Sequence, residues 1–290
     1  MARNHAKRPG NRPPGPPGAR PGPGTFARPE RGKEGGPVWL WGTHAVLAAL
    51  ANPDRQFLQF LATGNAAERL PKLALTPQII TGKELEQRLP PGAVHQGIAV
   101  MAEPLEALAL EDLIEEGATR VAVLDQVSDP HNLGAIFRSA AAFGFSGLVL
   151  QTRHAPPISG VVAKSAAGAI ETVIEVRSVN IARALEQLAE AGFHTVGLAG
   201  ESNRPLDLAV KGAAKVAVVL GAEGAGIRHG VAKACTRLAR IPMQAGMESL
   251  NVSNAAAIAF YEAMKRKGIV PPPSVARLSE DDGGFDGEAD

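Results

Sequence analysis

The sequence has a single cysteine, Cys235, so it excludes an internal disulfide and any zinc site built from several thiolates. It also lacks an apolar run near the roughly 18 residues that a membrane-spanning helix needs, and its first ten residues lack the apolar segment of a secretory signal. Neither sign of charge dominates, because 30 basic and 29 acidic residues leave a net charge of +1. These absences predict a cytoplasmic protein with no membrane partner, in which Cys235 is a small buried residue.

The remaining composition is that of a globular protein. With 290 residues, 45% of them hydrophobic and 20% charged, the chain can build one large or two small cores. We expect two domains between two polar tails.

Both tails differ from the middle of the chain in charge. Residues 1–37 are rich in proline, glycine and arginine, and residues 1–36 hold eight basic against two acidic residues. Because residues 1–37 contain too few apolar side chains to form a core, we expect this tail to be disordered. We interpret this tail as a basic arm that touches RNA phosphates, with a solvated tail that only aids solubility as the alternative. Residues 271–290 hold six acids and one arginine, which predicts an acidic disordered tail.

Residues 38–101 are expected to form the smaller domain. A helical apolar spacing (HAVLAALANP) is followed by strand-type runs at 57–63, 78–81 and 97–101, which indicates a small α/β fold. Residues 102–118 suit a linker that leads into a short helix.

Residues 119–270 are expected to form an α/β domain with a mainly parallel sheet. Near-continuous Val, Leu and Ile runs alternate with helical patterns, as a sheet covered by helices on both faces requires. Ligands of such sheets bind beyond the carboxyl ends of the strands. The loops to inspect are therefore 125–132, 198–202, 221–226 and 242–251.

One of these loops is rich in glycine. The segment VVLGAEGAGI places Gly221, Glu223, Gly224 and Gly226 after a strand. Its order, G-x-x-G-x-G, is not the dinucleotide fingerprint G-x-G-x-x-G, so a nicotinamide enzyme is disfavoured. The glycines would let backbone amides approach a ligand closely, and an ordinary tight turn is the alternative.

A second segment superficially resembles a phosphate loop. Lys164 and Ser165 have the order found there, but Ala163 stands where the glycine before the lysine is required. Nucleotide hydrolysis is rejected on that ground.

Two further segments join polar side chains to helices. In DQVSDPHNLGAIFR, Arg138 lies six residues after Asn132; taken alone, these could be a surface residue and a helix N-cap. In MESLNVSN, Ser249, Asn251 and Ser253 precede an alanine-rich helix, where they could hold a ribose or cap that helix.

Together, the three polar segments resemble, in order and spacing, the three motifs of the SpoU family of 2′-O-ribose RNA methyltransferases, which belongs to the knotted SPOUT class. The first motif is NLGAIFR at 132–138, the second is LGAEG at 220–224, and the third is IPM at 241–243 with SLNVS at 249–253. WGTHAV at 41–46 and HQGI at 95–98 resemble the N-terminal substrate-binding domain of many members. The resemblance covers about residues 38–268, and it is strongest to enzymes that methylate a guanosine of large-subunit ribosomal RNA.

The resemblance implies a trefoil knot, a homodimer, an RNA substrate and S-adenosylmethionine as cofactor, with no metal. The implied catalytic residues are Arg138, Asn132, Glu223, Ser249 and Asn251. The implied cofactor-binding residues are Ala199, Gly200, Gly221, Ile241 and Leu250. Two alternatives stay open: a relative that acts on tRNA, and a non-catalytic RNA-binding or ribosome-assembly protein.

Overall fold

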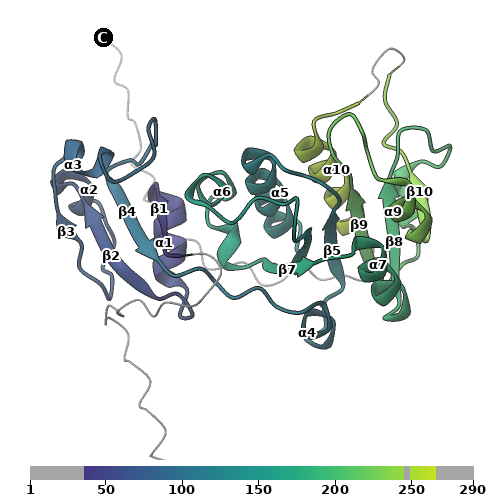
Figure 1. Ribbon diagram of the computed structural model, residues 1–290, viewed down its shortest axis with the longest axis horizontal. Helices are drawn as coiled ribbons and strands as arrows, with labels where there is room; N and C mark the ends of the chain where they lie inside the picture. The colour runs from purple at the N-terminus through teal and green to yellow at the C-terminus, as the bar shows by residue number, and fades with distance from the viewer. Residues whose placement is uncertain (1–35, 245–248, 266–290) are drawn as a thin grey trace, which may run out of the picture.

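The computed structural model describes residues 36–244 and 249–265 (Figure 1). The predictions of a basic arm and an acidic tail concern residues outside these ranges, apart from the last two residues of the arm. The described chain contains two sheets, one of four strands and one of six. The fold class predicted from the sequence, a small N-terminal α/β domain followed by a larger α/β domain with a parallel sheet, is confirmed.

The first sheet has the strand order β1-β4-β2-β3. Its elements are β1 (Val38–Trp41), α1 (Thr43–Ala51), β2 (Phe57–Ala62), α2 (Gly64–Ala67), β3 (Gln78–Ile79), α3 (Gly82–Glu86) and β4 (Ile98–Ala102). β4 runs antiparallel to both β1 and β2, whereas β3 pairs parallel with β2. The three strand-type runs read from the sequence are thus confirmed as β2, β3 and β4.

The second sheet is entirely parallel, in the order β10-β8-β9-β5-β6-β7. Its strands are β5 (Arg120–Leu124), β6 (Gly147–Gln151), β7 (Ile174–Ser178), β8 (Phe193–Leu198), β9 (Lys215–Leu220) and β10 (Arg237–Ala239). Its helices are α4 (Leu110–Glu115), α5 (Pro130–Ala142), α6 (Gly160–Ala166), the 3-10 turn η1 (Ala169–Glu171), α7 (Ile181–Glu190), α8 (Leu206–Val210), α9 (His229–Ala234) and α10 (Val252–Met264).

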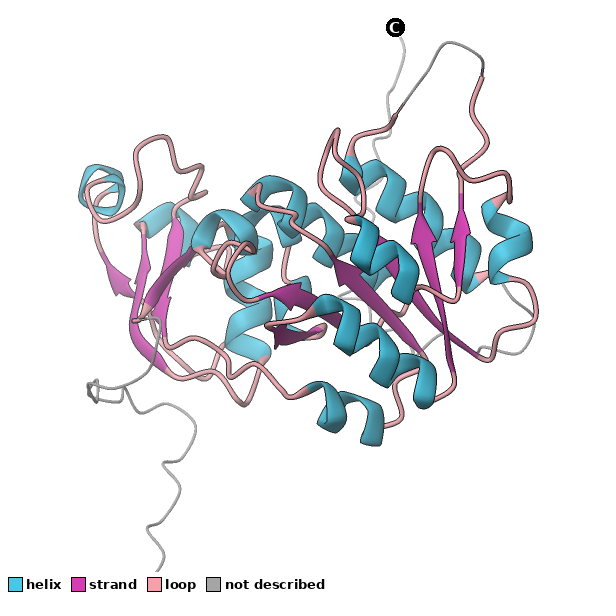
Figure 2. Ribbon diagram, turned by 45° about the vertical axis from the view of Figure 1, so that its right-hand side comes forward, coloured by secondary structure: helices cyan, strands magenta, loops and turns pink. Residues whose placement is uncertain are grey.

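Helices cover both faces of this sheet (Figure 2), which explains why its strands β5, β6 and β9 carry almost continuous apolar runs. Alternate side chains of one strand serve different cores. On β5, Ala122 and Leu124 pack with α5, α6, α8 and α10. Val121 and Val123 pack on the other side with α4, α7 and α9.

The end of β10 and the residue after it pair with the loop between β8 and α8. The N–H of Ala199, at the start of that loop, donates to the carbonyl of Ala239. At the end of the loop, the N–H of Arg240 donates to the carbonyl of Arg204, and the N–H of Leu206 donates to the carbonyl of Arg240. The segment is therefore held from both sides by one loop, as the trefoil knot of the fold class requires.

The two domains pack against each other along α6 and η1. A Cβ added at Gly160 would lie 1.9 Å from the Trp41 ring and 2.2 Å from the Trp39 carbonyl oxygen, so only glycine allows this approach of α6 to β1. One hydrophobic cluster runs from the first sheet into α5 and α6. In the described ranges, no helix is long and apolar enough to cross a membrane.

Candidate functional site

Three side chains from distant parts of the chain meet at the carboxyl edge of the parallel sheet. The Nδ2 group of Asn132 donates to Oε1 of Glu223 at 2.9 Å, and the Nδ2 group of Asn251 donates to the same oxygen at 2.8 Å. Asn251 Nδ2 also reaches Oδ1 of Asn132 at 3.0 Å. We call Asn132, Glu223 and Asn251 the polar triad; it contains one predicted residue from each motif.

The start of α5 leaves Asn132 free for this role. The helix begins at Pro130, and its N-cap is Asp129, whose side chain accepts from His131 N–H. The alternative that Asn132 is the N-cap is therefore wrong. Asn132 lies within the first turn, almost fully buried, with its amide directed at Glu223.

Of the two roles that the sequence left open for this segment, Asn251 has that of the helix cap. Its Oδ1 accepts from the backbone N–H of Ser253 at 2.9 Å and of Asn254 at 3.4 Å, so Asn251 caps α10. Its Nδ2 group remains directed at Glu223 and Asn132. The cap therefore also fixes the orientation of an amide within the polar triad.

Two residues of the polar triad, Asn132 and Glu223, line a hollow of about 150 Å³. Its lining comprises Gln126, Val127, Ser128, Asp129, Asn132, Ala222, Glu223 and Val252. A hollow of this size is smaller than the roughly 300–1,000 Å³ of pockets for whole small molecules, and it suits a single sugar-sized group. Amide, hydroxyl and carboxylate groups on its wall can exchange hydrogen bonds with such a group.

The predicted cofactor residues gather at the same edge of the sheet. β10, β8 and β9 are neighbours, and Gly197 is paired with Val219 and Leu198 with Ala239. The residues just beyond these strands, Ala199, Gly221 and Ile241, therefore lie side by side; Gly200 follows in the first loop, and Leu250 directly precedes Asn251. Within the described ranges, the backbone groups of Gly221, Ile241 and Leu250 make none of the loop hydrogen bonds. Free main-chain donors and acceptors at this edge fit a polar cofactor.

Gly221 has a further reason to be glycine. A Cβ at this position would lie 2.0 Å from the carbonyl carbon of Gly226 and 2.3 Å from the Ile227 nitrogen. The loop thus folds back on Gly221, with Gly224 and Gly226 at positive φ. The glycine pattern is first a requirement of the loop fold, which in turn directs Glu223 toward Asn132.

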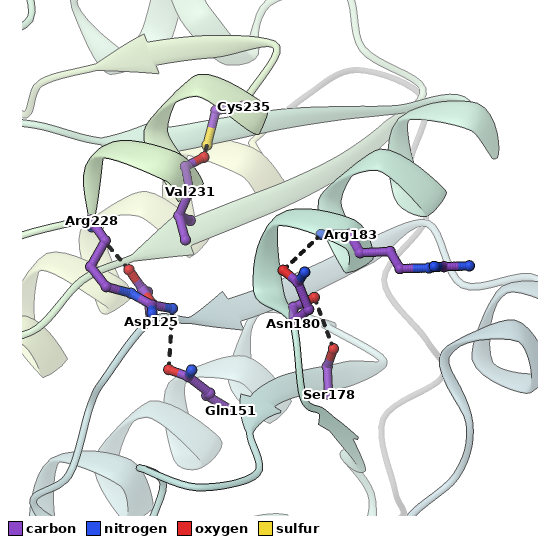
Figure 3. A network of polar contacts seen from close by, with 8 residues as sticks. All are labelled: Asp125, Gln151, Ser178, Asn180, Arg183, Arg228, Val231 and Cys235. Carbon is purple, nitrogen blue, oxygen red and sulfur yellow. Dashed lines mark hydrogen bonds and ion pairs between the residues drawn. The ribbon is translucent and has the colours of Figure 1, made fainter.

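An ion pair that the sequence did not reveal anchors this loop (Figure 3). The fully buried Asp125 accepts from the backbone N–H of Arg228 at 2.9 Å and from its Nη2 group at 2.6 Å. The same Nη2 group reaches Oε1 of Gln151 at 3.3 Å. Charged partners 103 residues apart give no local sequence signal, although the position of Asp125 directly after a strand could have drawn attention to it.

Two predicted catalytic residues are not part of the polar triad. Arg138 is exposed on α5, and Ser249 is exposed directly before Leu250. Six residues correspond to about 240° around a helix, so Arg138 and Asn132 project from different sides of α5. Their proposed roles require contact with the substrate rather than with the polar triad.

Burial changes the acidity of one thiol near the loop anchor. Burial, followed by the negative charge of Asp125, raises the pKa of Cys235 to about 12. Its Sγ donates to the Val231 carbonyl at 3.3 Å (Figure 3). Cys235 is therefore a structural thiol, as its half-buried position suggests. In the described part of the chain, no three His, Cys, Asp or Glu side chains are grouped so that they could hold a metal ion.

Comparison with known proteins gives the same two-part division. The model of the SpoU rRNA Methylase family matches residues 119–261, and the model described as RNA 2′-O ribose methyltransferase substrate binding matches residues 39–108. The chain is 35% identical over 241 residues to the 23S rRNA (guanosine-2′-O-)-methyltransferase RlmB of Vibrio vulnificus, covering 79% of this chain and 97% of that protein. It is 37% identical to the Ralstonia nicotianae protein of the same name, covering 80% and 97%.

Solved structures share the fold. The SpoU methyltransferase AviRb from Streptomyces viridochromogenes, crystallised with AdoMet, aligns with a TM-score of 0.65 at 22% identity, over 79% of this chain and 89% of that one. An AdoMet-bound rRNA methyltransferase from Sinorhizobium meliloti aligns with the same TM-score at 23% identity, over 78% and 86%. The matched motifs, both family models and this fold together establish that the chain belongs to the SpoU rRNA methylase family.

Proposed function

We propose that this protein transfers the methyl group of S-adenosylmethionine to the 2′-hydroxyl of a guanosine in large-subunit ribosomal RNA, in the cytoplasm. The observation that carries the proposal is the polar triad, in which Asn132, Glu223 and Asn251 converge beside a sugar-sized hollow. Relatives with the printed activity match nearly their whole length, which supports the same substrate class here.

The cofactor supplies an electrophilic methyl group on a sulfonium. Ala199, Gly200, Gly221, Ile241 and Leu250 would hold it through their main-chain groups at the carboxyl edge of β8, β9 and β10. No side chain at these positions is charged, so shape and main-chain hydrogen bonds provide the recognition.

A ribose hydroxyl is a weak nucleophile at neutral pH. Its oxygen must therefore be aligned with the methyl group, and its O–H bond must be weakened so that the proton can leave. Asn132 and Asn251 are held in fixed orientations by Glu223 and can position the sugar. Ser249 adds a hydroxyl at the mouth of the site. Arg138, exposed and always charged, holds the target phosphate or ribose and stabilises the developing negative charge.

We assign a separate role to each proposed domain. Residues 38–101 bind RNA, residues 102–118 link the domains, and residues 119–270 carry out methyl transfer. Because the acceptor is a 2′-hydroxyl, the same contacts distinguish RNA from DNA.

A homodimer is part of this proposal, and the exposed side of α10 supports it. Ile258 and Tyr261 are large apolar side chains with 39% and 46% of their surface exposed. Both lie on the same stripe of α10, since they are three residues apart. Exposed apolar side chains at helical spacing suit contact with a second copy. Light scattering of Ile258→Asp should report a monomer, whereas Leu208→Asp, a control at an exposed leucine on α8, should leave the dimer intact.

The deciding experiment is methylation of ribosomal RNA with a radiolabelled methyl donor, followed by mapping of 2′-O-methyl positions. Label on a single guanosine of the large-subunit RNA is expected. Mapping the same positions in a strain that lacks the protein should show that guanosine unmethylated. Label on tRNA, or none at all, would contradict the proposal.

A further inference from the structure

The interface between the two domains contains a polar contact on its solvent side. Lys164 of α6 extends across Gly42, where an added Cβ would lie 2.2 Å from the ammonium nitrogen. Its Nζ donates to Oε1 of Gln96 at 2.8 Å, and the same oxygen accepts from the N–H of Thr43 at 3.0 Å. Lys164 thus reaches from the larger domain to the smaller one.

Two features indicate that Lys164 does more than hold the two domains together. Gln96 has a φ of 56°, an unfavourable conformation for a residue with a side chain, and such strain often marks a functional position. In the described part of the chain no carboxylate lies within ion-pair distance of Lys164, and desolvation lowers the pKa of its ammonium group. A cation paired only with an amide oxygen remains available to an anion.

The same side of the molecule carries further basic groups. Ser165, next to Lys164, lies with its Oγ 3.4 Å from Nδ1 of His131 on α5. His131 and Arg138 are seven residues apart on α5, which places them on one stripe of the helix. Both are exposed. Lys164, Gln96, His131 and Arg138 are here called the interface strip. It starts at the smaller domain, reaches His131 next to Asn132 in the first turn of α5, and continues along that helix to Arg138.

The buried side of the same interface is held by an ion pair. The Nε and Nη2 groups of Arg55 donate to the two carboxylate oxygens of Glu171, both at 2.9 Å. The side chains are only 2% and 3% exposed. Asn52 also donates to Glu171, and Arg55 donates to the Glu103 carbonyl. Arg55 and Glu171 come from different domains, so this hydrogen-bonded ion pair holds the two domains in one relative orientation. Removing either partner would leave a buried charge without its counter-ion.

We propose that the RNA substrate crosses the domain interface along the interface strip, with a backbone phosphate bound by Lys164, and that Glu171 positions the strip by holding Arg55. This inference rests on the proposed function and adds the path of the substrate. Its chemistry is that of phosphate recognition by cations, which positions RNA without reading its sequence.

The test measures the affinity of the full-length protein for transcribed large-subunit RNA at several KCl concentrations. Lys164→Gln should weaken binding about tenfold and reduce the slope of log K against log salt by about 1, whereas Lys164→Arg should restore both. The control is Lys233→Gln, which removes the same charge from α9 on the opposite face of the sheet and should change neither.

Glu171→Gln tests the positioning of the interface strip without changing the charge of Lys164. It should raise the KM for RNA severalfold while leaving the salt slope, kcat and cofactor affinity near the wild-type values. If Glu171→Gln fails to fold, Lys164→Gln still decides, because its side chain is on the surface. Wild-type affinity and slope in Lys164→Gln would overturn the inference. If instead the unmodified protein methylates no ribosomal RNA, the proposed function fails, and that result is read independently of these variants.

Discussion

Asn132 and Glu223 are 91 residues apart in the chain, yet the Nδ2 group of Asn132 donates a 2.9 Å hydrogen bond to Oε1 of Glu223. Asn251 donates to the same oxygen. One carboxylate oxygen therefore orients two amides at the sugar-sized hollow.

Glu223→Ala should lower methylation by roughly 10²-fold, because both amides lose the acceptor that orients them. Glu223→Gln keeps a carbonyl oxygen at this position and should retain more activity. Steady-state kinetics with saturating cofactor measures the difference. Equal losses in the two variants would show that the negative charge, rather than the orientation of the amides, is what matters.

Arg138→Ala should lose roughly 10²-fold or more of the methylation rate while keeping its fold and its cofactor affinity, since the side chain is exposed and supports no internal contact among the described residues. Calorimetry with the cofactor and single-turnover assays with RNA separate the two effects. Arg183→Ala, at an exposed position of α7 on the other face of the sheet, is the matched control. Near-wild-type turnover in Arg138→Ala would refute the catalytic role.

Asn251→Ala should lower the free energy of unfolding by about 1 kcal/mol, because α10 loses the side-chain cap that accepts from Ser253 and Asn254. It should also reduce methylation, since the same side chain belongs to the polar triad. Urea denaturation measures the first effect. Asn254→Ala, exposed one turn into the helix, should leave stability within about 0.5 kcal/mol.

Arg228→Ala should destabilise the fold by about 3 kcal/mol, because it leaves the carboxylate of Asp125 buried without its cation. The loop that carries Glu223 should also become more mobile, and hydrogen exchange of residues 221–228 would detect this. Thermal unfolding provides the stability measurement. An unchanged melting temperature would mean that solvent reaches Asp125 and replaces the lost bonds.

The thiol of Cys235 should resist alkylation in the native state at pH 8 and react only after unfolding, since its pKa is raised from 9.0 to about 12. A thiol whose folded pKa is higher than its unfolded pKa favours folding fully below pH 9, and this contribution is lost as pH rises from about 9 to 12. Cys235→Ala should remove that part of the pH dependence. Rapid native alkylation would contradict the burial.

The alternation of strands and helices in the larger domain, and the three motifs, could be read from the residues alone. After a basic first residue, β5 and β9 are apolar throughout because both of their faces are covered, so their parallel arrangement could be predicted from the runs alone. The motif spacing likewise predicted which loops carry Asn132, Glu223 and Asn251 before any of them could be placed in space.

How these residues meet became clear from the folded molecule. The sequence offered Asn132 as the cap of α5, but in the structure Asp129 caps the helix and Asn132 faces Glu223. The pairs Asp125 with Arg228 and Arg55 with Glu171 join residues more than 100 positions apart. Local propensity and periodicity act over a few residues, whereas such contacts depend on strand order and on the threading of the chain, so the physical reason for the site's geometry lies in the folded molecule.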